Sequence, residues 1–350
     1  MRKRLAGMAI AAVGGAALAW SALAVASNPG MAGWHWGRLP VGAAPPPVAA
    51  ANGMSAAKVA LGRRLFYDPA LSRDGTLACA GCHEQGRGFA DGQRVHVGVT
   101  GEMGIRNVPG LANVAWRSPL TWTDAKIDTL EQQALVPMTG ERPVEMGMKG
   151  AEAEIARRLV ADPCYRALFA AAFPGRARGG AAIGLGEVTA ALASFQRTLI
   201  STDMPYDRYR RGQKDALSAP AQRGEAQFHA AGCVDCHSGA DLTDNRFHYA
   251  GTTALGTSPG YNEKAPVAGE ALIQDFRTPP LRNVAVTGPW LHDGSAATME
   301  DAIRRHAATL LGKVTMPDML AFMEALTDRS FLTEPKFGKP VGRCGVRETG

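Results

Sequence analysis

Residues 79–83 read CAGCH and residues 233–237 read CVDCH, and these two copies of one pattern decide the fold of the chain. In an exported protein, C-x-x-C-H is typical of covalent haem attachment, because the two thiols add across the haem vinyl groups and the adjacent histidine then faces the iron. Paired cysteines also occur in zinc knuckles and redox dithiols, but two copies in a repeated frame favour two haems c. The predicted haem-binding residues are Cys79, Cys82, His83, Cys233, Cys236 and His237.

The sequence around the two patterns also repeats. A helix is expected to begin at Ser55 and another at Ser218, since serine is a favoured N-cap. Each helix carries a glycine and a phenylalanine at the same spacing: Gly62 and Phe66, then Gly224 and Phe228. Apolar helices near residues 187–199 and 317–326 close the two units. Because strand-like alternation is scarce, we predict an all-α fold of two cytochrome c-like haem domains in tandem, with long loops.

The N-terminus has the character of a secretory signal. A basic start at residues 2–4 precedes an uncharged stretch that ends in a small-x-small cleavage site before Ser27, although an uncleaved membrane anchor has the same appearance. The expected division is therefore a signal peptide (1–26), a flexible Gly- and Pro-rich lead-in (27–54), an N-terminal haem domain (55–205) and a C-terminal haem domain (206–350). This organisation predicts a periplasmic protein.

The charge of the chain argues against a nucleic-acid partner. The formal net charge is +6, and removal of the three basic residues at positions 2–4 leaves +3. Two haems add about four propionate negatives, so the mature protein is close to neutral. Two further cysteines, Cys164 and Cys344, could form a disulfide in an oxidising compartment or remain free thiols.

Several longer sequence motifs resemble those of the bacterial dihaem cytochrome c peroxidase family, which includes MauG. The resemblance covers about residues 55–330. It rests on residues 65–69 (LFYDP), 88–92 (GFADG), 106–109 (RNVP), 131–135 (EQQAL), 143–147 (PVEMG), 280–284 (PLRNV) and 292–295 (HDGS).

The resemblance implies a division of labour between the haems. The N-terminal haem would be peroxidatic, the C-terminal haem would store and relay electrons, and Trp122 would lie between them. Gln133, Pro137 and Glu145 resemble the distal-pocket residues, with the glutamate moving a proton between the peroxide oxygens. The segment from Pro137 to Glu145 is about two residues longer than the family pattern, so Glu141 is an alternative.

Two positions depart from the family. Many members cap the peroxidatic iron with a histidine sixteen residues past the proximal histidine, where this chain has Val99; His96 is the nearest substitute. The second departure is at the second iron, whose distal ligand in the family is often Met, or Tyr in MauG. Here that position is His306, and Met316 is an alternative thioether ligand. The family's interdomain calcium ion maps onto Asn107, Thr287 and Pro289, which offer the oxygen donors that Ca²⁺ prefers.

Three functions fit these features. The first is reduction of hydrogen peroxide with electrons from a small donor cytochrome c or cupredoxin. The second is a MauG-like or MbnH-like enzyme that uses peroxide to oxidise residues of a partner protein, and it suits an uncapped first haem. The third is a plain electron carrier, which would have no need of the proton-transferring Gln133 and Glu145. The sequence leaves the oligomeric state open.

Overall fold

The computed structural model describes residues 34–175, 183–249, 275–306, 312 and 314–342; the predicted signal peptide and Cys344 lie outside these ranges. The described part is rich in helix and poor in strand. The helices are α1 (Ala56–Phe66), α2 (Cys79–Cys82), α3 (Leu130–Thr139), α4 (Glu152–Ala161), α5 (Pro163–Ala172), α7 (Leu185–Gln196), α8 (Pro205–Arg210), α9 (Ala219–Ala230), α10 (Met299–His306), α11 (Met316–Glu324) and α12 (Arg329–Thr333). The strands β1 (Phe247–Tyr249) and β2 (Asp275–Arg277) pair antiparallel.

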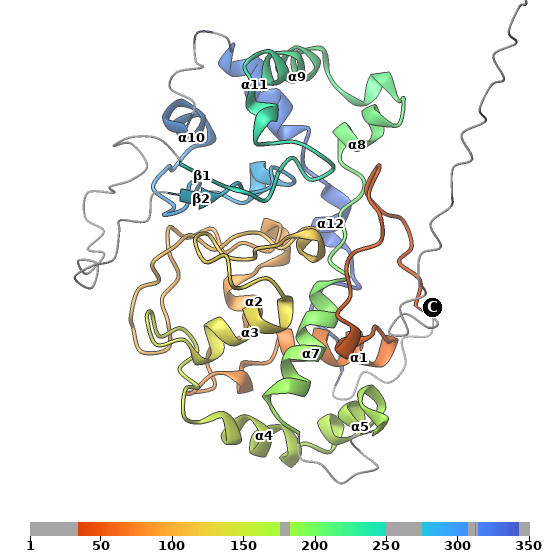
Figure 1. The fold of residues 1–350 in the computed structure, drawn as a ribbon, viewed down its shortest axis with the longest axis vertical. Coiled ribbons are helices and arrows are strands. Elements are labelled where there is room, and N and C mark those ends of the chain that lie inside the picture. The colour runs from red at the N-terminus through yellow and green to blue at the C-terminus, as the bar shows by residue number, and fades with distance from the viewer. Residues whose placement is uncertain (1–33, 176–182, 250–274, 307–311, 313, 343–350) are drawn as a thin grey trace, which may run out of the picture.

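The first buried cluster forms around the crossing of α1 and α7, in the lower half of Figure 1. The Ser55 side chain caps α1 by accepting a hydrogen bond from the Lys58 backbone N–H, as the sequence predicts. Gly62 allows the helices to meet, since a Cβ at this position would lie 1.9 Å from the Ala191 carbonyl oxygen. Phe66 and Phe195 then pack edge to face with ring centroids 5.3 Å apart.

The second buried cluster repeats this arrangement with α9 and α11, in the upper half of Figure 1. Ser218 caps α9, and a Cβ on Gly224 would lie 2.1 Å from the Asp318 carbonyl oxygen. Phe228 and Phe322 make the equivalent edge-to-face contact at 5.4 Å. The helices and glycines that the sequence repeat predicts are therefore confirmed, and each pair forms the centre of one half.

A left-handed asparagine ties a loop to the closing helix in both halves. Asn113 (φ 55°) donates its backbone N–H to the Leu199 carbonyl, and Asn283 (φ 61°) donates to the Leu326 carbonyl, both at 2.8 Å. Asparagine tolerates this conformation better than most residues. These two equivalent hydrogen bonds fix the loop after each C-x-x-C-H motif to the closing helix of its half in the same way.

The junction between the halves is more ordered than its polar sequence indicates. Residues 205–210 form α8, and its Asp207 is buried because Arg282 donates to both carboxylate oxygens at 2.6 and 3.1 Å. At the other end of the chain, Phe331 of α12 and Phe337 pack in the first cluster. The polypeptide therefore crosses between the halves more than once.

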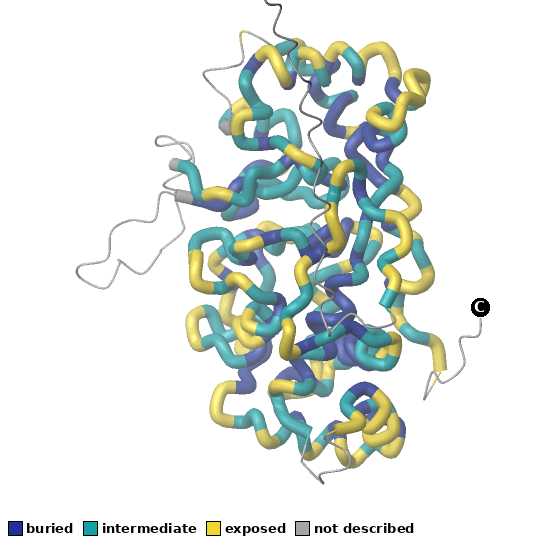
Figure 2. The backbone as a smooth tube through the Cα atoms, turned by 45° about the vertical axis from the view of Figure 1, so that its right-hand side comes forward, coloured by how far each residue is buried: buried dark blue, intermediate teal, exposed yellow. Residues whose placement is uncertain are grey.

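The lead-in from residue 34 is mostly irregular, and it is attached to the body. The Trp116 indole N–H donates to the Ala44 carbonyl at 2.9 Å, and Asn52 donates to Glu131 at 2.6 Å. Figure 2 shows buried segments running through the interior of both halves and exposed segments along the outer edges. No helix in the described ranges combines the length and the apolar character needed to cross a membrane.

Candidate haem sites

The two predicted proximal histidines are held in the same way. His83 Nδ1 lies 2.7 Å from the Phe89 carbonyl oxygen, and His237 Nδ1 lies 3.0 Å from the Leu242 carbonyl oxygen. A carbonyl only accepts, so each Nδ1 carries the proton and each Nε2 keeps a lone pair for a metal. Phe89 and Leu242 both have positive φ (65° and 53°), which turns their carbonyls toward the rings. The free lone pair on Nε2 of the histidine in each C-x-x-C-H motif therefore fits an axial imidazole ligand.

The first pair of cysteines lacks the character of a redox dithiol. Burial raises the pKa of the Cys79 thiol to about 12, and burial together with nearby Glu145 raises the pKa of Cys82 still further. Reactive C-x-x-C cysteines have lowered pKa values instead. These half-buried thiols with raised pKa values fit covalent attachment to an apolar group better than thiol exchange.

The second pair of cysteines lies beside a small group of metal-binding side chains. Cys236, Asp244 and His248 bring one ligand atom each within 4.8 Å of one another. His248 Nε2 is 2.7 Å from an Asp244 carboxylate oxygen, so these two side chains already satisfy each other. Cys233 is absent from the group, unlike in a zinc knuckle, whose paired cysteines bind one ion together.

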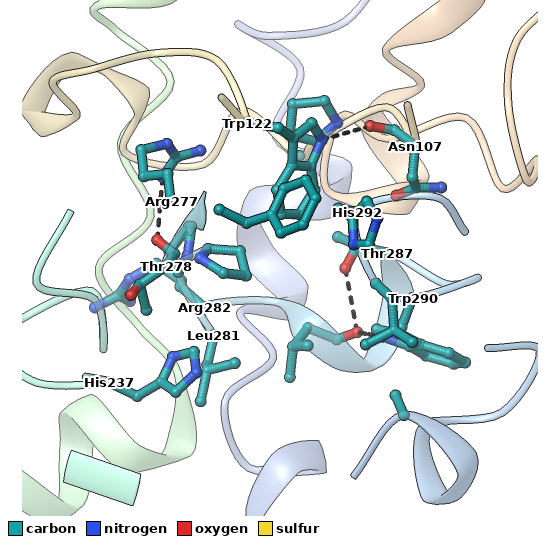
Figure 3. Close-up of a pocket in the computed structure, with 18 of the residues that line it drawn as sticks. Asn107, Trp122, His237, Arg277, Thr278, Leu281, Arg282, Thr287, Trp290 and His292 are labelled. Carbon is teal, nitrogen blue, oxygen red and sulfur yellow. Dashed lines mark hydrogen bonds between the residues drawn. The ribbon is translucent and has the colours of Figure 1, made fainter. Parts of the chain in front are cut away.

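A cavity of about 430 Å³ adjoins the second C-x-x-C-H motif, residues 233–237 (Figure 3). Both halves line it: Trp122, Asn107 and Arg117 come from the first, and Cys236, His237 and Arg277 come from the second. Its size and mostly apolar lining suit an organic cofactor. The cavity, the histidine and the cysteine together fit a haem.

Helix α10 forms part of the cavity wall. Met299, Ala302 and Ile303 line the cavity, and His306 is the last residue of the same helix. Residues three, four and seven positions apart share one face of a helix, so the His306 backbone position belongs to the cavity-facing side. Its side chain lies outside the described part of the structure. Met316 is not among the residues that line the cavity, whereas Met299 and Met323, which the sequence analysis missed, are.

The residues expected at a calcium site lie together with Trp122. Asn107, Thr287 and Pro289 all line the cavity. The Trp122 indole N–H donates to the Asn107 carbonyl at 2.9 Å, and the Asn107 amide nitrogen donates to the Gln93 carbonyl at 3.0 Å. The Asn107 backbone N–H reaches the His292 carbonyl at 2.9 Å, so this wall joins the two halves.

The two candidate glutamates of the first site differ in environment. Glu141 has a side chain 69% exposed and pairs with Lys149 at 3.6 Å. Burial raises the pKa of Glu145 above its usual range, and nearby His96 partly opposes that shift. Since a half-buried carboxyl with a raised pKa is a better proton carrier than an exposed one, the environment favours Glu145.

Helix α3 carries Gln133 and Pro137, and Pro137 is bonded to the segment that carries this glutamate. Pro137 lies inside the helix and has no N–H, so it cannot donate to the Gln133 carbonyl one turn earlier. Its own carbonyl accepts from the Met146 backbone N–H at 2.9 Å, which joins α3 to the segment that carries Glu145.

The loop that carries Val99 and His96 is tied down. The Val99 backbone N–H donates to the Glu145 carbonyl at 2.8 Å, and the Gly104 N–H donates to the His96 carbonyl at 2.7 Å. His96 Nδ1 lies 3.1 Å from a carboxylate oxygen of Asp91, whose side chain is 1% exposed. This pair of His96 and Asp91 was not evident from the sequence, although Asp91 belongs to the motif at residues 88–92.

Of the two alternatives that the sequence leaves open for Cys164, a disulfide or a free thiol, the structure has the disulfide. Cys164 is disulfide-bonded, while the four cysteines of the C-x-x-C-H words are free in the absence of haem. The position of Cys344 lies outside the described residues, so this pairing stays a prediction.

Comparison with known proteins agrees with this geometry. The profile of the family described as Di-haem cytochrome c peroxidase matches residues 56–215. The methylamine utilization protein MauG of Methylorubrum extorquens is 41% identical over 251 residues, covering 71% of this chain and 68% of that protein. The cytochrome c551 peroxidase of Pseudomonas aeruginosa is 32% identical over 279 residues, covering 77% and 78%. Fold, site and relatives define an oxidoreductase of the dihaem class.

The chain belongs to the dihaem cytochrome c peroxidase family, whose members carry two haems. A solved structure titled as a MauG-like protein associated with microbial copper homeostasis has a TM-score of 0.79 and 37% sequence identity, covering 88% of this chain and 99% of that one. The diheme peroxidase BthA of Burkholderia thailandensis, at 22% identity and a TM-score of 0.63, shares the fold.

Proposed function

We propose that this chain is an exported dihaem peroxidase in which residues 79–83 attach the peroxidatic haem and residues 233–237 attach the electron-relay haem. Both haems are attached covalently, one in each of two tandem domains that meet near residues 203–216. The observation that carries the assignment is Glu145, a half-buried carboxyl with a raised pKa whose charge acts on Cys82. A plain electron carrier needs no such group beside its haem.

The residues of the first site handle protons. Reduction of hydrogen peroxide to two waters consumes two electrons and two protons, and the bound haem supplies the iron at which the O–O bond is cleaved. Glu145 takes the proton from one peroxide oxygen on its carboxylate and delivers it to the other, so that the departing oxygen leaves as water. Gln133 orients the peroxide by hydrogen bonding. The bond between Val99 and the Glu145 backbone holds the glutamate in place.

The second site supplies the electrons. Trp122 lines the cavity of this site and is bonded to Asn107, so it lies on the path between the halves. We assign His306 as the second ligand of this iron because its position is on the cavity-facing side of α10. Asn107, Thr287 and Pro289 would hold Ca²⁺ through oxygen donors and fix this wall. The electrons come from a small periplasmic donor such as a cytochrome c or a cupredoxin.

A second candidate function is oxidation of a partner protein with peroxide, as in a MauG-like or MbnH-like enzyme. Val99 favours it, because an aliphatic side chain cannot cap the first iron and the site would be open without prior reduction. The likeness to the MauG-like structure also supports it. The two functions differ in whether steady peroxide consumption needs a small electron donor or a protein substrate.

The test of the proposed function begins with haem content. Mature protein should retain two haems per chain through acid-acetone extraction, and the double change C79S/C82S should remove one of them. Purified enzyme should then consume peroxide with a reduced donor cytochrome. One extractable haem, or peroxide consumption unaffected by loss of the first haem, would overturn the assignment.

A further inference from the structure

Two arginines are buried in the wall of the cavity without an acidic partner. Arg277 is 1% exposed and Arg117 is 6% exposed, and both line the cavity beside His237. Among the described residues, no carboxylate forms an ion pair with either one. Their printed hydrogen bonds go to backbone carbonyls: Arg117 to Gly110 and Ala112, and Arg277 to Thr121 and Thr278. The Arg117 Nε–H is buried with no acceptor.

A neighbouring arginine shows how this fold treats a buried cation when an acid is available. Arg282 has a fully buried side chain, and it pairs with Asp207 at 2.6 Å and with Asp241 at 2.9 Å. Burial lowers the pKa of Arg117 to about 9, with the charge of Arg277 as the next cause, and burial lowers that of Arg277 to about 10. The nearest carboxylate that acts on Arg117 is Asp241, which already pairs with Arg282 at 2.9 Å. Two close cations that share only this committed carboxylate are costly inside a protein, because desolvation of each charge is not fully repaid. The cavity is therefore suited to an anionic group from outside the polypeptide.

We infer that Arg117 and Arg277 bind the two propionate carboxylates of the haem attached at residues 233–237. This assignment rests on the proposed function, since it presumes a haem in the cavity. A haem c matches the need: an apolar ring suits the lining, and two carboxylates meet two guanidinium groups. The carboxylates would accept hydrogen bonds from the Arg117 Nε–H and from the Arg277 terminal nitrogens. Figure 3 shows Arg277 on the same side of the cavity as Thr278, and the Arg277 backbone N–H donates to the Trp122 carbonyl at 2.9 Å.

This pairing has an electrostatic consequence for the haem. A propionate without its guanidinium leaves an uncompensated negative charge beside the iron, which favours the ferric state. Arg277→Gln should therefore lower the midpoint potential of the second haem, and Arg277→Lys, which keeps the charge, should stay close to the parent protein. Arg304→Gln is the matched control: it removes the same charge from an exposed side chain paired with Glu300, where solvent screens the effect.

The experiment is a spectroelectrochemical titration of the holoenzyme, in which the low-spin ferric EPR signal separates the second haem from the first. Haem content is measured for each variant, so loss of haem, which would contradict the proposed function, is distinct from an altered potential. The inference fails if Arg277→Gln and the parent protein have the same potential, or if only the first haem shifts.

A second measurement needs no variant. Infrared difference spectra of protein whose haem propionates carry ¹³C should show ionised carboxylates, because paired guanidinium groups stabilise the charged form. Labelled bands of protonated carboxylic acids at neutral pH would overturn the inference even where the arginine variants do not accumulate.

Discussion

The resting state of the first haem is the sharpest test of how this chain differs from peroxidases that need reductive activation. The sequence resemblance puts Val99 at the position of their capping histidine, and a valine side chain has no lone pair to offer a metal. His96 is the remaining candidate on the same loop. We expect the all-ferric protein to hold the first haem high-spin and open, so that peroxide reacts without prior reduction, and His96→Ala should leave that spin state unchanged.

The structure gives the cost of moving His96 to the iron. The ring would leave the buried Asp91 carboxylate, a hydrogen bond to a charged group that contributes about 1.5–3 kcal/mol. The loop would lose the backbone bonds of Val99 to Glu145 and of Gly104 to His96, each contributing about 0.5–1.5 kcal/mol. The low ends of these ranges sum to a cost of about 2.5 kcal/mol, or roughly 60-fold, which ligation of the iron by His96 would first have to repay.

The assay is EPR of the oxidised protein before and after addition of peroxide. One high-spin and one low-spin ferric signal are expected, in the parent protein and in His96→Ala alike. His35→Ala is the control for removal of an exposed histidine elsewhere in the chain. Two low-spin signals in the parent protein, one of which becomes high-spin in His96→Ala, would refute the reasoning.

Four further predictions concern catalysis, ligation, calcium and packing. Glu145→Gln should keep both haems but slow peroxide turnover by about 10²–10⁴-fold, whereas the exposed Glu141→Gln should be near the parent rate; the reverse order in a steady-state assay would move the proton role to Glu141. His306→Ala should change the low-spin EPR signal of the second haem, and an unchanged spectrum would exclude His306 as its ligand. Chelator treatment should release Ca²⁺, measured by mass analysis, and slow electron exchange between the haems, because the ion would join oxygen donors from both halves; gently purified protein without calcium would disprove the site. Gly62→Ala should lower the free energy of unfolding by about 1–3 kcal/mol, because its Cβ meets the α7 backbone. Gly186→Ala, in open space on α7, should leave the free energy of unfolding unchanged or raise it by up to about 1 kcal/mol.

Much of the fold was predictable because local signals and packing agree. Ser55 and Ser218 begin the helices as N-caps, and the repeated spacing from glycine to phenylalanine marks where each helix meets its partner. Such features depend on a few neighbouring residues, so the sequence displays them directly. The helix pairs of both halves follow from them.

Features that depend on distant residues were not predictable. The stretch around α8 is polar in sequence, yet its Asp207 is buried because Arg282, seventy-five residues later, pairs with it. The carbonyls that orient the predicted proximal histidines come from Phe89 and Leu242, and neither phenylalanine nor leucine signals a left-handed backbone. In the same way, nothing in the sequence near Arg117 indicates that its side chain is buried together with Arg277.

The repeat itself points to where the two proposed haem functions diverge. The helix pair, the asparagine turn and the carbonyl that holds the histidine are the same in both halves, so in the proposed function these features would provide attachment and an axial ligand without setting reactivity. What differs is the segment that accompanies each C-x-x-C-H motif. For residues 79–83 it is α3 and the chain around Glu145, and for residues 233–237 it is α10, whose His306 position lies at the cavity. A buried acid serves an iron that must bind and protonate peroxide, whereas a second histidine ligand serves an iron that only exchanges electrons. An exchange of roles between the haems would therefore require changes in these segments alone, with the shared frame left intact.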